Sequence, residues 1–370
     1  MRKLCVLLAF LLLFGGALAD GAAFDDMTDA CRFVRQEARQ GTSEITLTLT
    51  DDAVDHRSAA TIRDILTDVL EYCESYEIAF ADSRKGLEIT VSCLPRPGLK
   101  MLHAWETGDR SALTAEESAC LDHAFAIAEA CRAGKRSALE TELAVYQYIC
   151  RHVTYAHDAV AKGTGTPEYL RASTCLGALV DGAAQCQGYA EAFWLLGTLS
   201  GLDVETQYGW AGGGVAGKHA WNTIRLGHHT YMVDVCWGDT SGDSFEPDTP
   251  DYRTFNAGLD RLPAERRWHP EAEVTPISTV TDHHHSAFAG ITADAVTVAS
   301  LDEAVQYAMA QHHRKESYAH VFIPGQSISV SKAQDAMLAA IRSAGISTKW
   351  GRLAHEYAGG TYLIIRWVHN

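Results

Sequence analysis

The sequence predicts an α+β protein in which a central helix and a strand hairpin lie between two small α/β modules. Three observations lead to this fold class. Apolar residues recur at helical spacing over 114–132, 137–152 and the stretch that follows Gly182. The runs 219–226 and 230–236 have the composition of two successive strands of one hairpin. Strand and helix patterns alternate again near both ends of the chain.

Length, composition and charge limit the class of protein. The chain has 370 residues, enough for two or three domains and a sizeable core. Its 47% hydrophobic and 21% charged residues are ordinary for a globular protein. The formal net charge is -16, and a nucleic-acid site would need clustered lysine and arginine. We therefore expect no nucleic-acid partner.

The first 19 residues have the organisation of a signal peptide. Arg2 and Lys3 form a positive start, residues 4–14 are apolar, and Ala17 to Ala19 has the small-residue pattern of a cleavage site. The apolar run is about half of the ~20 residues that a membrane span needs, so cleavage is favoured over an anchor. The sequence thus predicts a secreted or extracytoplasmic protein without an integral membrane segment after cleavage.

Export would change how the cysteines are interpreted, because an oxidising compartment allows disulfides. Removing Cys5 with the signal peptide leaves an odd number of the ten cysteines, which implies at least one thiol. Cys186 is the candidate. The other eight could form up to four bridges, or several could be buried as small apolar residues. The chain has no CxxC pair, and we expect neither a metal nor a cofactor.

Residues 20–113 predict a small N-terminal β-α-β module. The segment 44–50 (EITLTLT) alternates like a strand, 58–76 places apolar residues on one helical face, and 87–94 reads as a second strand. Residues 20–43 are expected to be an irregular or short helical lead-in.

Residues 114–282 predict the core together with a proline-rich extension. The helix at 114–132 opens with T-A-E-E, a capping signal, and a second helix follows at 137–152. A short extended piece at 153–158 and a helix or loop at 168–180 lead to the central helix. Beyond Asp239, prolines interrupt the pattern too often for regular elements.

Residues 283–370 predict a C-terminal α/β module. Helices are expected at 301–312 and 331–344 and strands at 320–323 and 361–368. The last strand is almost continuously apolar, which is typical of a central strand. The element order is similar to that of the N-terminal module, and a degenerate repeat is one interpretation.

Cys186 lies where the central helix is expected to begin. Apolar residues recur at helical spacing from Tyr189 to Leu199, which places Cys186 in the first turn, where the helix dipole favours a thiolate. Gly188 leaves room for a substrate or a neighbouring strand to approach. A structural cysteine at a helix start is the alternative interpretation.

A histidine and an aspartate lie on the predicted hairpin. If Gly227-His228 is a two-residue turn, His219 opposes Cys236 and Asp234 opposes Trp221. His219 and Asp234 then share one face as diagonal neighbours with Cβ atoms ~7–8 Å apart. The carboxylate would bind Nδ1 of the imidazole and leave Nε2 for the thiol. A loop of odd length would place the two side chains on opposite faces.

The segments GAAQCQGYAEAF, HAWNTIRL and YMVDVCWGD resemble, in this order, the three core motifs of the transglutaminase-like superfamily, here a secreted bacterial-type member. The resemblance covers residues 140 to 240. It implies a papain-like core, in which the helix with the nucleophile Cys186 packs on an antiparallel sheet carrying the base His219 and its partner Asp234. Members of the superfamily include cross-linking transglutaminases, cysteine peptidases, deglycosylating amidases and inactive scaffolds.

The resemblance also implies a reaction. Cys186 would attack an amide carbonyl of a protein or peptide, release an amine and hold a thioester until an amine or water resolves it. The Cys186 backbone N–H and one side-chain donor would hold the oxyanion. Tyr155 lies where the family often has an aromatic donor, although a packing role is the equal alternative; Gln185 is a second candidate by analogy with papain-like enzymes. Trp221 and Asn222, which flank the base, are candidates for the cleft lining, with core packing as the alternative.

Two other patterns are not expected to carry chemistry. The glycines of 209–217 predict a loop bordering the cleft rather than a phosphate site, because no lysine-serine pair follows. Residues 283–285 are three consecutive histidines, and the side chains of consecutive residues point in different directions. This favours a solvated loop over a metal site. The first functional hypothesis is therefore an exported acyl-transfer enzyme. The second is a catalytically inactive module that binds a polypeptide or cell-wall partner.

Overall fold

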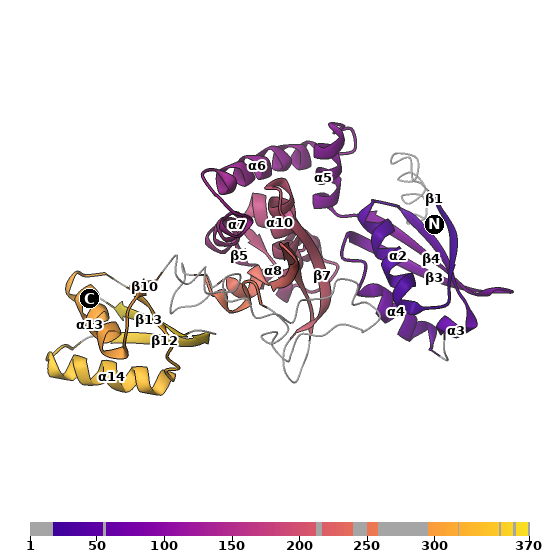
Figure 1. Cartoon of the computed structure of the whole chain (residues 1–370). Coiled ribbons are helices and arrows are strands. Elements are labelled where there is room, and N and C mark those ends of the chain that lie inside the picture. Colours follow the sequence, from indigo (N-terminus) through magenta and orange to yellow (C-terminus); the bar gives the residue numbers. More distant parts are fainter. Residues whose placement is uncertain are drawn as a thin grey trace.

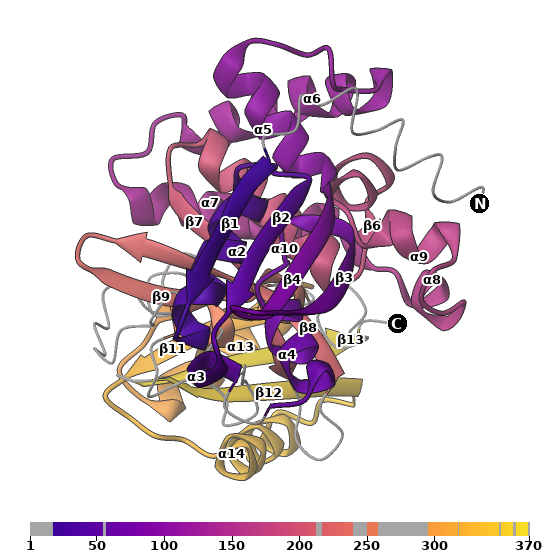
Figure 2. The ribbon, with the colours of Figure 1, turned by 90° about the vertical axis from the view of Figure 1, so that its right-hand side faces the viewer.

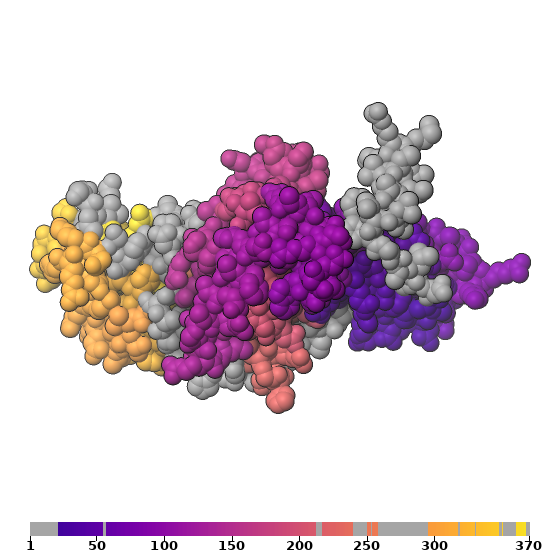
Figure 3. Space-filling view, turned by 90° about the horizontal axis from the view of Figure 1, so that it is seen from above, coloured from indigo at the N-terminus to yellow at the C-terminus, as the bar shows by residue number. Residues whose placement is uncertain are grey.

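The computed structural model describes residues 18–54, 57–211, 217–239, 250–257, 295–316, 318–347, 349–357 and 360–368. These ranges form an α+β structure, which confirms the predicted fold class (Figure 1). Most of the predicted signal peptide, the glycines 212–214, most of the proline-rich segment and the histidines 283–285 lie outside the described residues. The N-terminal, central and C-terminal parts follow one another along the molecule when it is seen from above (Figure 3).

The N-terminal part is a four-stranded sheet with helices, and its strands are seen side by side in Figure 2. The order is β1-β2-β4-β3, with β1 parallel to β2 and β4 antiparallel to both of its neighbours. The elements are β1 (Leu18–Phe24), α2 (Met27–Arg39), β2 (Glu44–Leu49), α3 (Asp51–Val54), α4 (Ala59–Thr67), β3 (Cys73–Ser83) and β4 (Gly86–Pro95).

This part differs from the expectations in two places. Of the two alternatives for residues 20–43 the helical one holds, since they contain the whole of α2, whose first turn is capped by Asp26, but they also contain most of β1. The helix expected over 58–76 ends at Thr67, since the chain from Cys73 onward is strand β3. The strands predicted at 44–50 and 87–94 are confirmed as β2 and β4.

The centre of the molecule is α10 (Cys186–Leu199), which packs on an antiparallel sheet and on several helices of the described residues. Twelve of its residues are buried, so this helix is apolar on nearly every side, as expected of a core helix. The sheet consists of β7 (Asp203–Ala211), β8 (Gly217–Leu226) and β9 (His229–Val233) in that order. The arrangement confirms the predicted core of a helix on an antiparallel sheet.

The other central elements surround α10. Helix α6 begins with the capping box that the sequence predicted, formed by Thr114 and Glu117. The elements are α5 (Pro97–Thr107), α6 (Ala115–Arg132), α7 (Ala138–His152), β5 (Thr154–Tyr155), α8 (His157–Ala161), α9 (Pro167–Ala172), η1 (Gly177–Asp181), β6 (Ala183–Ala184), α11 (Val235–Gly238) and η2 (Tyr252–Thr254).

Strand β7 includes the first residues of the glycine-rich loop that was expected over 209–217, whose residues 212–216 lie outside the described residues. It pairs with β8 from Asp203↔Arg225 to Ala211↔Gly217. Alternate residues at its start, Val204 and Thr206, are buried, which is the signature of a strand with one face on the core. Gly209 lies within this strand.

The C-terminal part is a second four-stranded sheet, with the order β10-β11-β13-β12. The helices predicted at 301–312 and 331–344 are confirmed, and so is the central position of the last strand; β12 was not predicted. The elements are β10 (Val296–Thr297), α13 (Leu301–His313), β11 (Tyr318–Pro324), α14 (Val330–Ser343), β12 (Lys349–Tyr357) and β13 (Gly360–Val368).

The two four-stranded sheets have the same topology. In each, the first two strands are parallel, and the last strand of the chain segment lies antiparallel between the second and third. This is the arrangement that the similar element order of the two ends suggested.

The cysteines divide into one disulfide and a set of thiols. A disulfide joins Cys73 on β3 to Cys93 on β4. The seven other cysteines of the described chain remain thiols. Cysteine parity therefore does not single out Cys186.

Within the described residues, every helix is too short or too polar to cross a membrane.

We predict that Glu142 makes the stability of the protein depend on pH. Glu142, on α7, is fully buried and accepts a hydrogen bond from Asn256 Nδ2 at 2.9 Å. Burial raises the pKa of Glu142 from 4.5 to about 8, although the hydrogen bond from Asn256 lowers it. The unfolded chain ionises first, so the free energy of unfolding should fall between pH 4.5 and 8, by roughly 1.4 kcal/mol per pH unit at most.

Glu142→Gln should flatten this fall in urea denaturation measured at pH 5, 6.5 and 8. The exposed Glu106→Gln is the matched control and should keep the dependence of the unchanged protein. A Glu142→Gln protein with an unchanged pH dependence would contradict the assignment.

Candidate active site

The chain places Cys186 at the first position of α10. Gly182, with a left-handed φ of 68°, ends η1, and β6 then pairs with β5 in parallel, with Tyr155 beside Ala184. The N-cap Gln185 is extended, and its backbone N–H donates to Ala172 O at 2.8 Å. Cys186 is 9% exposed. It therefore lies at the helix start, where the first N–H groups have no partner within the helix.

Gly188 allows a backbone segment to pass against the first turn of α10. A Cβ at this position would lie 2.5 Å from Ala172 O and 2.8 Å from Thr174 O. The space that the sequence suggested for a substrate or a strand is thus occupied by the chain leading into η1.

His219 and Asp234 are in contact. His219 Nε2 lies 2.8 Å from Asp234 Oδ2, and Asp234 is fully buried. The hairpin has the predicted register, from Leu226↔His229 to Asn222↔Val233. The ladder ends there, which corrects the expected pairing of His219 with Cys236.

Asp234 has two partners because the chain turns into a helix after β9. It is the N-cap of α11, and its Oδ1 accepts the backbone N–H of Trp237 at 3.0 Å. Its own N–H donates to Thr254 O at 3.0 Å. These contacts hold the carboxylate in one orientation toward His219.

The imidazole ring of His219 has the opposite orientation to the one predicted. Asp234 binds Nε2 rather than Nδ1, which leaves Nδ1 as the ring nitrogen for the thiol. Burial alone would lower the pKa of His219, but the charge and hydrogen bond of Asp234, and then the hydrogen bond and charge of Cys186, raise the pKa to about 9. His219 is thus suited to hold a proton beside a sulfur anion at neutral pH.

Two tryptophans flank the His219 ring. The Trp221 ring is stacked at 6.1 Å between centroids, and the exposed Trp237 ring lies at 5.6 Å. Trp221 is buried with Met232 and Ala257. This burial favours the alternative of core packing for Trp221 over a place in the cleft lining.

Asn222 is also buried and does not line a cleft. Its Nδ2 donates to Ala190 O at 3.0 Å and to Glu205 O at 3.3 Å. Asn222 therefore links β8 to α10 and to β7, and helps to fix the position of the helix that carries Cys186.

The two predicted oxyanion donors differ in where their donor groups point. The amide NH₂ of Gln185 donates to Ser173 Oγ at 2.7 Å and to Gln187 Oε1 at 2.8 Å, whereas its Oε1 accepts from Cys186 Sγ at 3.0 Å. Gln185 thus presents an acceptor to the thiol rather than a donor. Tyr155 is half-buried, and burial, followed by the charges of Cys186 and Cys236, raises its pKa to about 12.

Sequence reasoning missed three neighbours of Cys186. Tyr208 and Cys236 pack on a small cluster formed by Cys186, Ala190 and Ala220. Burial and then Cys186 raise the pKa of Tyr169 on α9. Tyr208 lies on a strand that was not predicted, and Tyr169 lies on α9, in a segment that was expected to be a helix or loop. Packing between elements brings both near Cys186, so no local pattern could have identified them.

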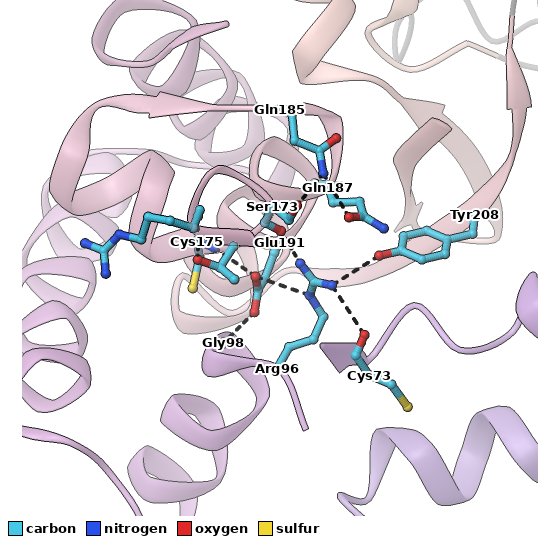
Figure 4. A network of polar contacts seen from close by, with 12 residues as sticks. Cys73, Arg96, Gly98, Ser173, Cys175, Gln185, Gln187, Glu191 and Tyr208 are labelled. Atoms are coloured by element: carbon cyan, nitrogen blue, oxygen red, sulfur yellow. Dashed lines mark hydrogen bonds and ion pairs between the residues drawn. The ribbon is translucent and has the colours of Figure 1, made fainter. Parts of the chain in front are cut away.

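A buried ion pair underlies the nucleophile helix and was also missed (Figure 4). Glu191 on α10 lies 3.3 Å from Arg96 Nε and accepts the backbone N–H groups of Gly98 at 2.7 Å and Cys175 at 2.8 Å. Both charged side chains are nearly inaccessible. The pair joins α10 to the chain that leaves the N-terminal sheet.

The fold places this protein in the papain-like class, with a cysteine at a helix start and a histidine on the adjacent antiparallel sheet. Residues 111–235 match the family model of the transglutaminase-like superfamily. This part of the chain therefore belongs to that superfamily, as the sequence motifs suggested. No curated protein matches the chain.

Several solved structures are similar to parts of the chain. A structure described as a TGase has 16% identity and a TM-score of 0.30, over 52% of this chain and 50% of that one. A candidate cysteine protease from Cytophaga hutchinsonii has 13% identity and a TM-score of 0.27, over 44% and 62%. A candidate protease from Parabacteroides distasonis has 7% identity and a TM-score of 0.25, over 88% and 65%. The chain thus spans between half and two thirds of each.

We predict that Gly188→Ala destabilises the start of α10. The added methyl group would collide with two backbone oxygens that cannot rotate away, which should cost about 1–3 kcal/mol. The matched control is Gly197→Ala on the same helix, where the new Cβ would meet only side-chain atoms of Val204 and Leu202. Urea denaturation should show the larger loss for Gly188→Ala; equal losses would contradict the packing described here.

We predict that His219 titrates well above the ordinary value of 6.5. The difference between NMR spectra of the unchanged protein and His219→Gln identifies its ring signal, whose midpoint should lie near pH 9. Asp234→Asn removes the main charge that raises the pKa, so the midpoint should move down. A midpoint near 6.5 in the unchanged protein would contradict the geometry.

The same shift has a consequence for stability. Because the folded-state pKa of His219 is raised, the contribution of His219 to the free energy of unfolding is fully present below about pH 6.5. It is lost as the pH rises through about 9.

Proposed function

We propose that this protein is an exported, cysteine-dependent acyl-transfer enzyme that acts on amides of proteins or peptides. The observation that carries the proposal is the position of His219, which contacts the thiol of Cys186 on one side and the buried carboxylate of Asp234 on the other. This is the arrangement by which a cysteine is activated as a nucleophile. The superfamily of residues 111–235 supports the same proposal.

The first half of the reaction forms a thioester. Before the attack, Nδ1 of His219 holds the proton of the Cys186 thiol as an ion pair; Sγ then bonds to the amide carbon while the carbonyl electrons move to oxygen. When the tetrahedral intermediate collapses, its C–N bond breaks and the leaving amine takes the proton from His219. Asp234 stabilises the imidazolium throughout, because its carboxylate faces Nε2 at 2.8 Å.

The second half returns the thiol. Water or a primary amine gives a proton to His219 and attacks the thioester carbon, the C–Sγ bond breaks, and the proton returns to sulfur. Water yields hydrolysis and an amine yields transamidation. Ammonia release from a glutamine substrate, measured with and without an added primary amine, distinguishes the two.

The negative oxygen of the intermediate needs donors near Cys186. We infer that the backbone N–H of Cys186 is one, since it starts α10 and has no partner within the helix. The hydroxyl of Tyr155, on the strand paired with β6, is a second. Gln185 can donate only if its amide turns away from Ser173 and Gln187.

We infer export from the predicted signal peptide at residues 1–19. The disulfide between Cys73 and Cys93 supports this, because such bonds persist in oxidising compartments.

We also infer three structural units in the order predicted by the sequence. Helix α5 packs on α10 and α6, which favours a first boundary near Arg96 instead of after residue 113. The identical strand orders of the first and last sheets favour related terminal modules.

We predict that Cys186 reacts selectively with iodoacetamide near neutral pH. It should label faster than a model thiol by at least about tenfold, and His219→Ala should abolish this advantage, because the imidazole that accepts the thiol proton is lost. Peptide mass mapping after brief exposure measures the labelling. Cys236→Ser is the control, since Cys236 packs beside Cys186, and it should leave Cys186 labelling fast. Labelling no faster than a model thiol would refute the enzyme proposal.

A further inference from the structure

The side chain of Tyr208 packs against the cluster that contains the proposed nucleophile, and Tyr208 is not one of the predicted site residues. Tyr208 is half-buried on β7 and packs on the cluster of Cys186, Ala190 and Ala220. On the sheet it pairs with Ala220, whereas the neighbouring Gly209 pairs with His219. Because side chains alternate along strands, Tyr208 and His219 leave the sheet on opposite faces.

Arg96 determines the orientation of this hydroxyl (Figure 4). Arg96 Nη1 lies 3.2 Å from the Tyr208 oxygen. A guanidinium can only donate, so the phenol oxygen accepts and its own hydrogen is directed elsewhere. Tyr208 is therefore held as a donor whose O–H points away from Arg96.

Arg96 is itself held in place from several directions. Its Nε faces Glu191 at 3.3 Å, its Nη1 faces Cys73 O at 3.4 Å, and its Nη2 donates to Ser173 O. Ser173 also accepts from Gln185 through its hydroxyl. The guanidinium thus contacts both Tyr208 and the loop that supports the residue before Cys186.

The charge of Arg96 strengthens Tyr208 as a donor. A cation that binds the phenol oxygen polarises the O–H bond, and this effect is larger in a buried site. Burial raises the pKa of Tyr208; Arg96 lowers it, but Cys186 and Glu191 raise it further. The hydroxyl therefore keeps its proton at neutral pH and can donate it in a hydrogen bond.

We propose that Tyr208 is a catalytic hydrogen-bond donor to the oxygen of the tetrahedral intermediate on Cys186, and that Arg96 is the positioning residue that orients it. The proposal rests on the proposed function. When Sγ bonds to the carbonyl carbon, the carbonyl electrons move to the oxygen, and the Tyr208 hydroxyl donates to that anion. The leaving group departs with the electrons of its bond to carbon.

The experiment compares two reactions of the same thiol in the full chain. Acylation by p-nitrophenyl acetate passes through an oxyanion and releases p-nitrophenolate. Alkylation by iodoacetamide forms an Sγ–CH₂ bond, releases iodide and forms no oxyanion. Tyr208→Phe keeps the ring but removes the donor, so acylation should fall by about 100-fold while alkylation is unchanged.

Tyr72→Phe is the matched control. Tyr72 is a buried tyrosine whose hydroxyl has no hydrogen-bond partner within the described residues, so the variant should acylate like the unchanged protein. Tyr208→Phe with acylation changed by less than about threefold would overturn the proposal. An equal fall in both reactions would also overturn it, because Tyr208 would then act on the thiol itself.

Arg96→Lys tests the positioning role without removing the positive charge. Lysine cannot reach Glu191, Ser173 and Tyr208 together, so acylation should fall while alkylation is retained as proof of folding. In the Arg96→Lys/Tyr208→Phe protein the two losses should not add, because both act through one hydroxyl. Additive losses would overturn the role of Arg96. An unchanged protein with neither a p-nitrophenolate burst nor selective labelling would instead refute the proposed function.

Discussion

The burial of α10 is the constraint on which the rest of the structure depends. A helix covered on nearly every side must be apolar all round, and its neighbours must approach it closely. Gly188 permits that approach at the first turn. The one charged side chain within the helix, Glu191, needs a buried partner, since an unpaired buried carboxylate is strongly unfavourable. Arg96 fills this need, and so links the N-terminal sheet to the base of the candidate site.

The same burial gives the candidate site its electrostatics. Asp234 is inaccessible to water, and both of its oxygens are occupied, one by His219 and one by the start of α11. A carboxylate held in this way acts strongly on the imidazole, which accounts for the raised pKa of His219. On the other face of the sheet, the buried cation Arg96 donates to the hydroxyl of Tyr208, whose side chain packs against the cluster that contains Cys186.

Local patterns allowed some elements to be predicted and concealed others. The capping box at Thr114 and the alternating strand at 44–50 were recognised because they are complete within a few residues. Helix α2 was expected only as one of two alternatives, and its bounds were not predicted, although Asp26 caps it and Arg35 lies on its buried face. Strand β7 was not predicted, and its end at Gly209 to Ala211 falls in the segment that was expected to be a glycine-rich loop. These elements are defined by their partners, which lie far away in the sequence.

The sequence by itself predicted that Cys186 starts a helix and that a two-residue turn at Gly227-His228 sets the register of the strands around His219 and Asp234. Both follow from local spacing and turn length. Only the tertiary structure decided that Nε2 of His219 faces Asp234, that Asn222 and Trp221 are buried, and that Gln185 offers its oxygen to the thiol. Only it brought Tyr208 and Arg96 together, across 112 positions. Side-chain orientation and such contacts arise from packing between distant segments, which no local pattern encodes.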